Sequence, residues 1–387
     1  MDLEILLMQL CRAALGDTTF DSSPFLSLSE SEWTELLDFA KKQDLAHLVA
    51  EGVSALGLSL SDQVMARLDK ESMIAIFRTE QMTFELASVK AALSEAEIPH
   101  IPLKGSVLRD LYPSLSLRVS TDIDLLVDPE HLEMARETLK NRLGYIDYAE
   151  TPHDLSLRAP SGFLVELHFD LFESEKSPRI AALLSRVWEY ARPSEESLYT
   201  YRLTDAMFYF YHLAHMAKHV LGGGCGIRPF LDLYILRKID KIGDDDERAW
   251  LLEVGGLSRF EEVASHLALA WMEEDEMTQS DLALSAYVLD GGIFGNLENR
   301  IAMKCTRRKG RLRYLLSRVF PSFSAMKRRY PLLKRAPYLT PFAYIYRLFS
   351  PIWSKNKNKI SNEAKTSAKL SYEDIETTKQ LLADLGL

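Results

Sequence analysis

The stretch that decides the fold runs Ser120-Thr121-Asp122-Ile123-Asp124-Leu125-Leu126-Val127, and Lys104-Gly105-Ser106 precedes it. Its apolar run predicts a β-strand over residues 122–127. Because alternate residues of a strand share a face, Asp122 and Asp124 point the same way while their apolar neighbours enter a core. Two adjacent carboxylates repel each other, and a divalent cation such as Mg²⁺ would hold them together, with phosphate oxygens completing its shell.

A second apolar stretch supplies another carboxylate. Residues 163–169 predict a strand that places Glu166 and His168 on one face. An unpaired carboxylate is unfavourable in so apolar a strand, so Glu166 either binds a cation or forms a salt bridge with an arginine such as Arg118 or Arg158. Three carboxylates that converge from two neighbouring strands are what a two-metal phosphoryl or nucleotidyl transfer site requires.

The composition is that of a soluble globular protein, with 47% hydrophobic and 26% charged residues in a chain of 387. This length accommodates two or three units. The three cysteines (Cys11, Cys225 and Cys305) are widely separated and match neither a disulfide framework nor a zinc pattern, which favours a reducing cytoplasm. The acidic start Met1-Asp2-Leu3-Glu4 differs from a signal peptide, and the sequence predicts no transmembrane segment.

The apolar pattern predicts an α+β fold in which a small mixed sheet is flanked by N-terminal and C-terminal helical domains. We expect helices over residues 1–97, the sheet-bearing core over 98–176, helices over 177–292, a basic aromatic-rich segment over 293–359, and a linker with a terminal helix over 360–387. The expected core strands are 101–103, 122–127, 145–149, 155–158 and 163–169. The expected core helices are 107–112 and 129–143, the latter with Gly144 at its C-cap position. Later helices are expected over 178–190, 204–220, 228–240, 246–254, 258–272 and 279–290.

Lys104-Gly105-Ser106 has the composition of a phosphate-binding loop. Glycine lets backbone N–H groups approach a phosphate, and Lys or Ser adds charge or hydrogen bonds. Arg118 lies four residues before Asp122, so it either reaches a triphosphate or forms an ordinary pair with a carboxylate. His168 either orients a carboxylate, takes part in proton transfer, or is a hydrogen-bonded, half-buried histidine without a catalytic role.

Three histidines, His212, His215 and His219, follow one another at helical spacings of three and four. A zinc site would need a fourth ligand, and no cysteine or other ligand is indicated nearby. The stripe therefore either faces the nucleotide or acceptor cleft or packs in the interior. Asp232, early in the next expected helix, is a candidate partner for one of these histidines.

These motifs, taken in order, resemble a known family: the uncharacterised bacterial nucleotidyltransferases of the DNA polymerase β-like superfamily. The resemblance is dense from Ile98 to Asp170 and continues weakly through His215, His219 and Asp232. The matching residues are Pro102 to Gly105, Tyr112-Pro113, Arg118, Asp122 to Val127, Leu143 to Tyr145, and Val165 to His168.

The resemblance implies a minimal nucleotidyltransferase core that moves an NMP from an NTP, with ATP expected, to an unidentified acceptor and releases pyrophosphate. Asp122, Asp124 and Glu166 would be catalytic and would hold Mg²⁺ (or Mn²⁺), with Glu166 helping to deprotonate the acceptor. The predicted nucleotide-binding residues are Lys104, Gly105, Ser106, Arg118, His168, His215, His219 and Asp232. The superfamily usually shows Gly-Ser or Gly-Gly at the phosphate loop, so Lys104 is an addition whose weight relative to Gly105-Ser106 is open.

Two other functions stay open. A nucleotide-sugar glycosyltransferase also uses an Asp-x-Asp metal motif, although it would normally have an extended βαβ region upstream, where residues 1–97 are predicted to be helical. A non-catalytic nucleotide-binding or interaction protein could keep the same fold, although intact Asp122, Asp124 and Glu166 argue against lost chemistry.

The late segment 304–359 contains 16 Lys/Arg and no Asp/Glu, in a chain whose net charge is −10. Interleaved aromatic and basic residues suit nucleic acid. The same residues suit an anionic membrane surface, with Phe349 and Trp353 at the interface. The third interpretation, and the favoured one, is a basic surface that docks on the acidic remainder of the chain.

Overall fold

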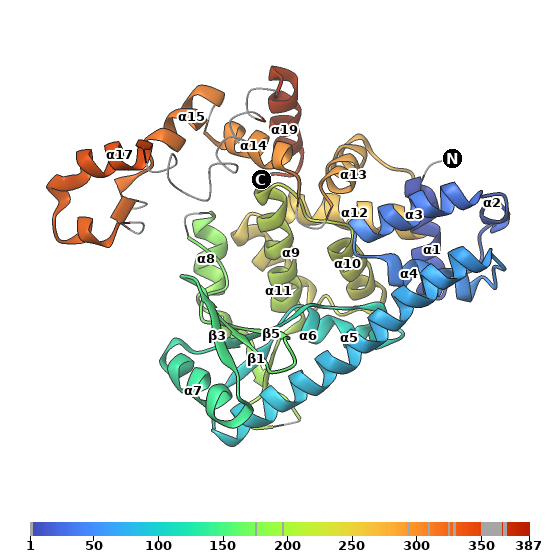
Figure 1. The fold of residues 1–387 in the computed structure, drawn as a ribbon, viewed down its shortest axis with the longest axis horizontal. Coiled ribbons are helices and arrows are strands. Elements are labelled where there is room, and N and C mark those ends of the chain that lie inside the picture. Colours follow the sequence, from blue (N-terminus) through green and yellow to red (C-terminus); the bar gives the residue numbers. More distant parts are fainter. Residues whose placement is uncertain are drawn as a thin grey trace. The chain divides into compact units, whose positions relative to one another are not determined.

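The computed structural model describes residues 3–174, 176–195, 197–292, 295–308, 310–323, 326–327, 330–349, 366 and 370–387. Many helices and a five-stranded mixed sheet make up the fold (Figure 1), which confirms the predicted α+β class. The chain forms two compact units. The first unit comprises residues 1–218, 227–281 and 386, and the second unit comprises residues 219–226, 282–385 and 387.

The N-terminal part is helical, as predicted. In α3 the Ser29 side chain accepts from the Glu32 N–H, and the Glu32 side chain accepts from the Ser29 N–H, so this helix begins with a capping box. Its apolar residues recur at helical spacing and are buried. The helices are α1 (Leu3–Ala14), α2 (Ser23–Leu26), α3 (Glu30–Lys42), α4 (Ala46–Ala55) and the 34-residue α5 (Asp62–Glu95).

The sheet has the strand order β1-β2-β5-β4-β3. Strand β2 lies between an antiparallel neighbour, β1, and a parallel one, β5, and the remaining strands pair antiparallel. The strands are β1 (His100–Pro102), β2 (Asp122–Val127), β3 (Ile146–Glu150), β4 (Asp154–Arg158) and β5 (Leu164–His168). All five therefore lie within a residue or two of the positions predicted from sequence, and that for β2 matches at both ends.

One face of the sheet is apolar and is covered by α5 and by α7 (Leu132–Leu143). Ile123, Leu125 and Val127 of β2 are fully buried there, together with apolar residues of α5 and α7. Because side chains alternate along a strand, Asp122 and Asp124 lie on the opposite face. Figure 1 shows α9 (Asp205–Gly222) on that other side of the sheet.

The connections around the core follow local signals with some differences. Helix α7 ends at Gly144, whose φ of 71° is left-handed, as predicted. The predicted helix over 107–112 is instead a short helix followed by a 3₁₀ turn. The elements between β1 and α7 are α6 (Gly105–Leu108) and three 3₁₀ turns, η1 (Arg109–Leu111), η2 (Leu115–Leu117) and η3 (Pro129–His131).

After the sheet the chain returns to helices. The predicted helix over 178–190 is wrong in its second half, because the Ser185 hydroxyl donates to the Ala182 carbonyl as α8 ends, and a 3₁₀ turn with an unpredicted hairpin follows. The elements are α8 (Pro178–Leu184), η4 (Val187–Tyr190), β6 (Ala191–Pro193), β7 (Tyr201–Leu203), α9, α10 (Arg228–Lys238), α11 (Asp245–Gly255), α12 (Ser258–Glu273) and α13 (Gln279–Gly291).

The second unit has its own apolar cluster, in which Ile301, Cys305 and Tyr314 pack with Leu370 and Ile375. The predicted linker at the start of residues 360–387 lies outside the described residues up to position 369, apart from residue 366. The helices and turns of the late segment are α14 (Leu297–Arg307), α15 (Arg311–Val319), η5 (Pro331–Lys334), η6 (Pro337–Leu339), α17 (Thr340–Phe349) and α19 (Tyr372–Asp384). Among the residues that the structure describes, none of the helices has both the length and the apolar character to cross a bilayer.

Candidate functional site

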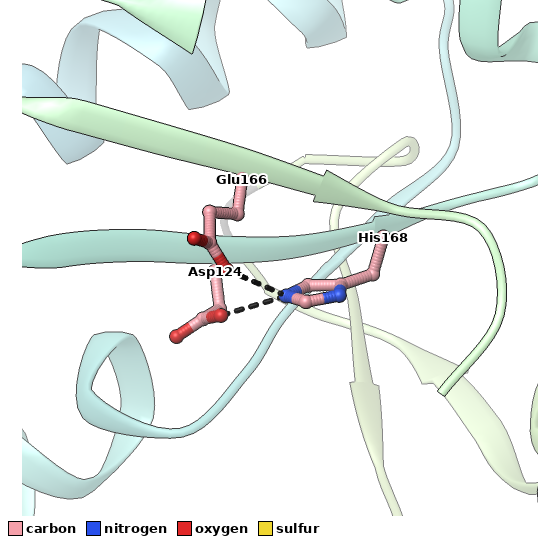
Figure 2. Close-up of side chains that lie close together, drawn as sticks. All are labelled: Asp124, Glu166 and His168. Carbon is pink, nitrogen blue, oxygen red and sulfur yellow. Dashed lines mark hydrogen bonds and ion pairs between the residues drawn. The ribbon is translucent and has the colours of Figure 1, made fainter. Parts of the chain in front are cut away.

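The parallel pairing of β2 with β5 brings acidic side chains together. Asp124 lies directly opposite Glu166 in the register, and His168 follows two residues later on the same face. His168 Nε2 donates to Asp124 Oδ1 at 2.7 Å and lies 3.6 Å from Glu166 Oε2 (Figure 2). One ligand atom from each of the three residues lies within 4.8 Å of the other two, so these side chains fit a divalent cation.

Asp122 lies outside this close group. It is at the start of β2, on the same face as Asp124, and is half-buried. Within the described part of the chain, no side chain donates a hydrogen bond to its carboxylate. The structure therefore brings Asp124 and Glu166 together, adds His168, and places Asp122 one strand repeat away.

Lys104 supplies a counter-charge to these acids. Its ammonium Nζ donates to Asp124 Oδ1 at 2.6 Å. The Lys104 backbone has a φ of 47° and a ψ of −124°, a conformation that side-chain-bearing residues rarely adopt. Strain of this kind persists where the surrounding structure requires it, often at functional sites.

Gly105, which follows Lys104, lies very close to Ser120. A Cβ at Gly105 would lie 2.0 Å from the Ser120 hydroxyl oxygen, so a larger residue would force the Ser120 side chain to move, whereas glycine lets this loop approach the segment that enters β2. Ser106 is buried next to it, and its hydroxyl has no hydrogen-bond partner among the described residues. Lys104, Gly105 and Ser106 therefore adjoin the start of the acidic strand, as the predicted phosphate loop requires.

The carboxylates have different protonation tendencies. Burial opposes ionisation of Asp124, but the positive Lys104 and the hydrogen bond from His168 outweigh it and lower the Asp124 pKa. Burial and the negative charge of Asp124 raise the pKa of Asp122 and of Glu166. Glu166 thus lies in surroundings that make it a better proton acceptor than an exposed glutamate. An added cation would relieve the repulsion among all three.

Arg118 is fully engaged with another carboxylate. Its Nε and Nη2 donate to the two Asp232 oxygens at 2.6 and 2.8 Å, and both side chains are buried. The Tyr112 hydroxyl donates to the same carboxylate at 2.9 Å. The sequence left two interpretations of Arg118 open, and the structure contains the second, a pair with a carboxylate. Asp232, for which a histidine partner was expected, instead pairs with Arg118 through both of its oxygens.

The three stripe histidines have different surroundings. His212 is buried and its Nε2 donates to the Pro229 carbonyl at 2.9 Å, toward α10. The His215 ring lies against the Tyr211 ring, with centroids 6.2 Å apart. His219 belongs to the second unit and is exposed. None of the three is in the group Asp124, Glu166 and His168, which is the metal-ligating group found among the described residues.

Sequence reasoning missed two residues of α9: Tyr211, whose pKa the site carboxylates affect, and Lys218, which pairs with Glu173. Burial raises the pKa of Tyr211. The negative charges of Asp124 and Glu166 raise it further, and the positive Lys104 opposes them. Lys218 lies 3.6 Å from Glu173, and burial together with the positive Lys176 and Lys104 lowers its pKa. Tyr211, His215 and Lys218 stand at helical spacings of four and three, a stripe that the predicted set of histidines obscured.

Arg228, at the start of α10, was also missed. Its guanidinium donates to Asp44 at 2.7 Å and to the Val119 carbonyl at 3.1 Å, on the segment that leads into β2. Burial lowers the Arg228 pKa, with the nearby Arg118 adding to this effect. Its positive charge also acts on Asp122. A Pro at the next position is the sequence signal of a helix start, but nothing local marks this arginine as a neighbour of the acids.

A small sheet with paired acids on its polar face, adjoined by a glycine loop, defines a class of candidate metal-assisted phosphoryl or nucleotidyl transfer sites. Residues 29–273 match the family described as uncharacterised nucleotidyltransferase, and this region is well over half of the chain. The chain therefore belongs to this nucleotidyltransferase family. No curated protein and no solved structure matched it.

Proposed function

We propose that this protein is a metal-dependent nucleotidyltransferase that moves an NMP from an NTP, with ATP the expected donor, to an acceptor hydroxyl. The observation that carries the proposal is the pairing of Asp124 with Glu166 across the parallel strands, with Asp122 on the same face, in a member of this family. In the reaction the acceptor oxygen bonds to the α-phosphorus, the bond from that phosphorus to the bridging oxygen breaks, and pyrophosphate leaves.

Asp122, Asp124 and Glu166 are the residues that would hold Mg²⁺ or Mn²⁺. Oxygen donors are what these ions prefer, and the crowding of acids whose pKa values are raised supports a cation there. Divalent ions bound at such a site stabilise the negative charge of the attacking and leaving oxygens.

The chain's own side chains would position the reactants. Glu166 is the candidate acceptor of the proton from the attacking hydroxyl, because burial and the negative Asp124 raise its pKa in spite of the positive Lys104 nearby. His168 holds Asp124 by a hydrogen bond and so keeps that carboxylate facing the site. Gly105 would present its backbone to phosphate, and Lys104 would contact the same phosphates once a cation competes for Asp124.

The test is release of pyrophosphate from each of the four NTPs with Mg²⁺. Asp124→Asn and Glu166→Gln should abolish it, because each removes an acidic oxygen that a metal or a proton needs. Glu150→Gln, an exposed glutamate on β3, is the matched control and should keep full activity. UDP release from a UDP-sugar would instead support a glycosyltransferase, and nucleotide binding without any turnover would support a binding protein.

A further inference from the structure

The exposed apolar side chains of the described residues are not scattered evenly. Of 24 large apolar side chains that are exposed, eight lie between positions 316 and 346 of the second unit. They are Leu316, Phe320, Phe323, Leu332, Tyr338, Phe342, Ile345 and Tyr346. Soluble proteins rarely concentrate exposed apolar surface in this way unless it binds a partner.

Helix α17 shows the pattern most clearly. Phe342, Ile345 and Tyr346 stand at spacings of three and one, so they share one helix face, and 54–68% of each residue's surface is exposed. Tyr344 points elsewhere, because its hydroxyl donates to the Pro321 carbonyl at 2.5 Å and its ring lies 5.8 Å from that of Phe320. The helix therefore has a side anchored through Tyr344 and an apolar side that is mostly exposed, on which Tyr346 also has a ring contact with Tyr330.

Cations accompany this apolar surface. Arg313, Lys334 and Arg335 are exposed, and the Lys327 ammonium lies 4.3 Å from the centre of the Phe323 ring. The sequence from 304 to 359 contains no carboxylate that could neutralise them locally. The occupant of the apolar face should therefore be both apolar and negatively charged.

We propose that this basic apolar surface, formed by α15, α17 and the turns between them, binds the surface of an anionic lipid bilayer. Short amphipathic helices with Lys/Arg and with Phe, Leu or Trp lie in the plane of the interface, apolar face down. The ten residues of α17 rise about 15 Å, roughly half of the hydrocarbon thickness, so this helix would lie along the interface. The residues of this surface belong to the second unit and the carboxylates to the first, and the inference does not depend on the proposed function.

Two other occupants fit less well. Nucleic acid bases could stack on the five aromatic side chains, but Leu316, Leu332 and Ile345 are aliphatic, have no ring to stack on a base, and gain from burial only in an apolar medium. A second copy of the chain would bring two surfaces of the same positive charge together, which repel each other. A bilayer with anionic headgroups accepts both the aliphatic side chains and the cations.

The experiment is co-sedimentation of the full chain with phosphatidylcholine vesicles, with and without phosphatidylglycerol. The wild type should bind the phosphatidylglycerol vesicles and lose affinity as salt rises. The triple variant Phe342→Ser/Ile345→Ser/Tyr346→Ser should bind at least about tenfold more weakly. Arg313→Gln/Lys334→Gln/Arg335→Gln should weaken binding roughly fivefold per charge, hence roughly a hundredfold, at low salt.

Helix α5 provides a matched control. Met73, Ile76 and Phe77 have the same spacing on their helix as the α17 residues and are 54–71% exposed, but α5 has more acidic than basic residues. Met73→Ser/Ile76→Ser/Phe77→Ser should leave vesicle binding unchanged. Circular dichroism and a melting curve confirm that each variant folds. Absence of wild-type vesicle binding, equal loss in the α5 control, or preference for a single-stranded oligonucleotide over vesicles would overturn the proposal.

Discussion

Lys104 and His168 both donate to the same oxygen of Asp124. Glu166 has only the more distant His168 Nε2, at 3.6 Å, and Asp122 accepts no hydrogen bond from a side chain among the described residues. Lys104 donates from a strained backbone position next to Gly105. A lysine held in this way acts as a counter-ion to the acids, and a divalent cation with its phosphate ligands can take over that task. The Lys104 ammonium, released from Asp124, would then contact the phosphate.

Lys104→Met should therefore separate the two tasks. Removing the ammonium leaves three carboxylates close together, so the free energy of unfolding in EDTA should fall by about 3 kcal/mol. Mg²⁺ should restore more stability to this variant than to the wild type, because the cation replaces the missing charge. Urea denaturation with and without Mg²⁺ measures both effects. Lys238→Met, at an exposed lysine of α10, is the control. Equal stabilisation of all three proteins by Mg²⁺ would contradict this account.

His212 gives a second prediction at this scale, for acid pH. Burial lowers its pKa below the ordinary 6.5, and its neutral Nε2–H donates to the Pro229 carbonyl. As pH falls below about 6.5, the unfolded chain binds a proton at this residue and the folded chain does not, so stability falls by up to about 1.4 kcal/mol per pH unit. His212→Gln, which retains an N–H donor, should flatten the dependence between pH 7 and 5. Urea midpoints across this range test it, and parallel curves for variant and wild type would disprove it.

At the scale of elements, the buried pair Arg118–Asp232 ties the segment before β2 to α10. Asp232→Asn leaves a buried guanidinium without its charge partner, so the free energy of unfolding should fall by about 3–5 kcal/mol. The double variant Arg118→Met/Asp232→Leu removes both charges and should recover most of that loss. Thermal melts of the three proteins measure this.

Nucleotide affinity of the same double variant decides whether Arg118 has a second task. If the role of the pair is only structural, the folded double variant should bind NTP as tightly as the wild type does. A large loss of affinity in a stable double variant would instead assign Arg118 to the triphosphate.

The elements that sequence reasoning predicted well are those with a local signal. The alternation in β2 and the left-handed Gly144 that ends α7 depend only on neighbouring residues. The proximity of Glu166 to the aspartates also followed, because an acid in an apolar strand requires a compensating partner. The parallel pairing of β2 with β5 was not predicted, since strand direction depends on the path of the whole connection.

Features that depend on distant contacts could not be read from the chain. Asp232 pairs with Arg118 across 114 residues, and no local pattern distinguishes that partner from the nearby histidines. Tyr211 lies near Asp124 and Glu166 only because α9 lies on the polar side of the sheet. The hairpin β6–β7 has three-residue strands with arginine and proline, too short for an alternation to be seen.

At the scale of the whole molecule, both compact units contain buried cysteines outside any disulfide: Cys11 in the first, and Cys225 and Cys305 in the second. A nucleotide that binds the carboxylate site stabilises the first unit, by about 2.7 kcal/mol at a hundred times its Kd. Mg²⁺ with NTP should therefore raise the urea concentration at which Cys11 reacts with a thiol reagent and leave that for Cys305 nearly unchanged. Mass spectrometry of the labelled peptides measures each, and equal shifts would show that the units unfold together.

The parallel pairing of β2 with β5 affects the order in which the acids of the site are synthesised. Parallel neighbours cannot be joined by a tight turn, so a helix and two further strands are built between Asp124 and Glu166. On the ribosome, the aspartates emerge well before the glutamate that completes the acidic site. A nascent chain that is stalled between them lacks one of the acids of the site. Insertions and deletions in the intervening loops leave the register that places Asp124 opposite Glu166 unchanged.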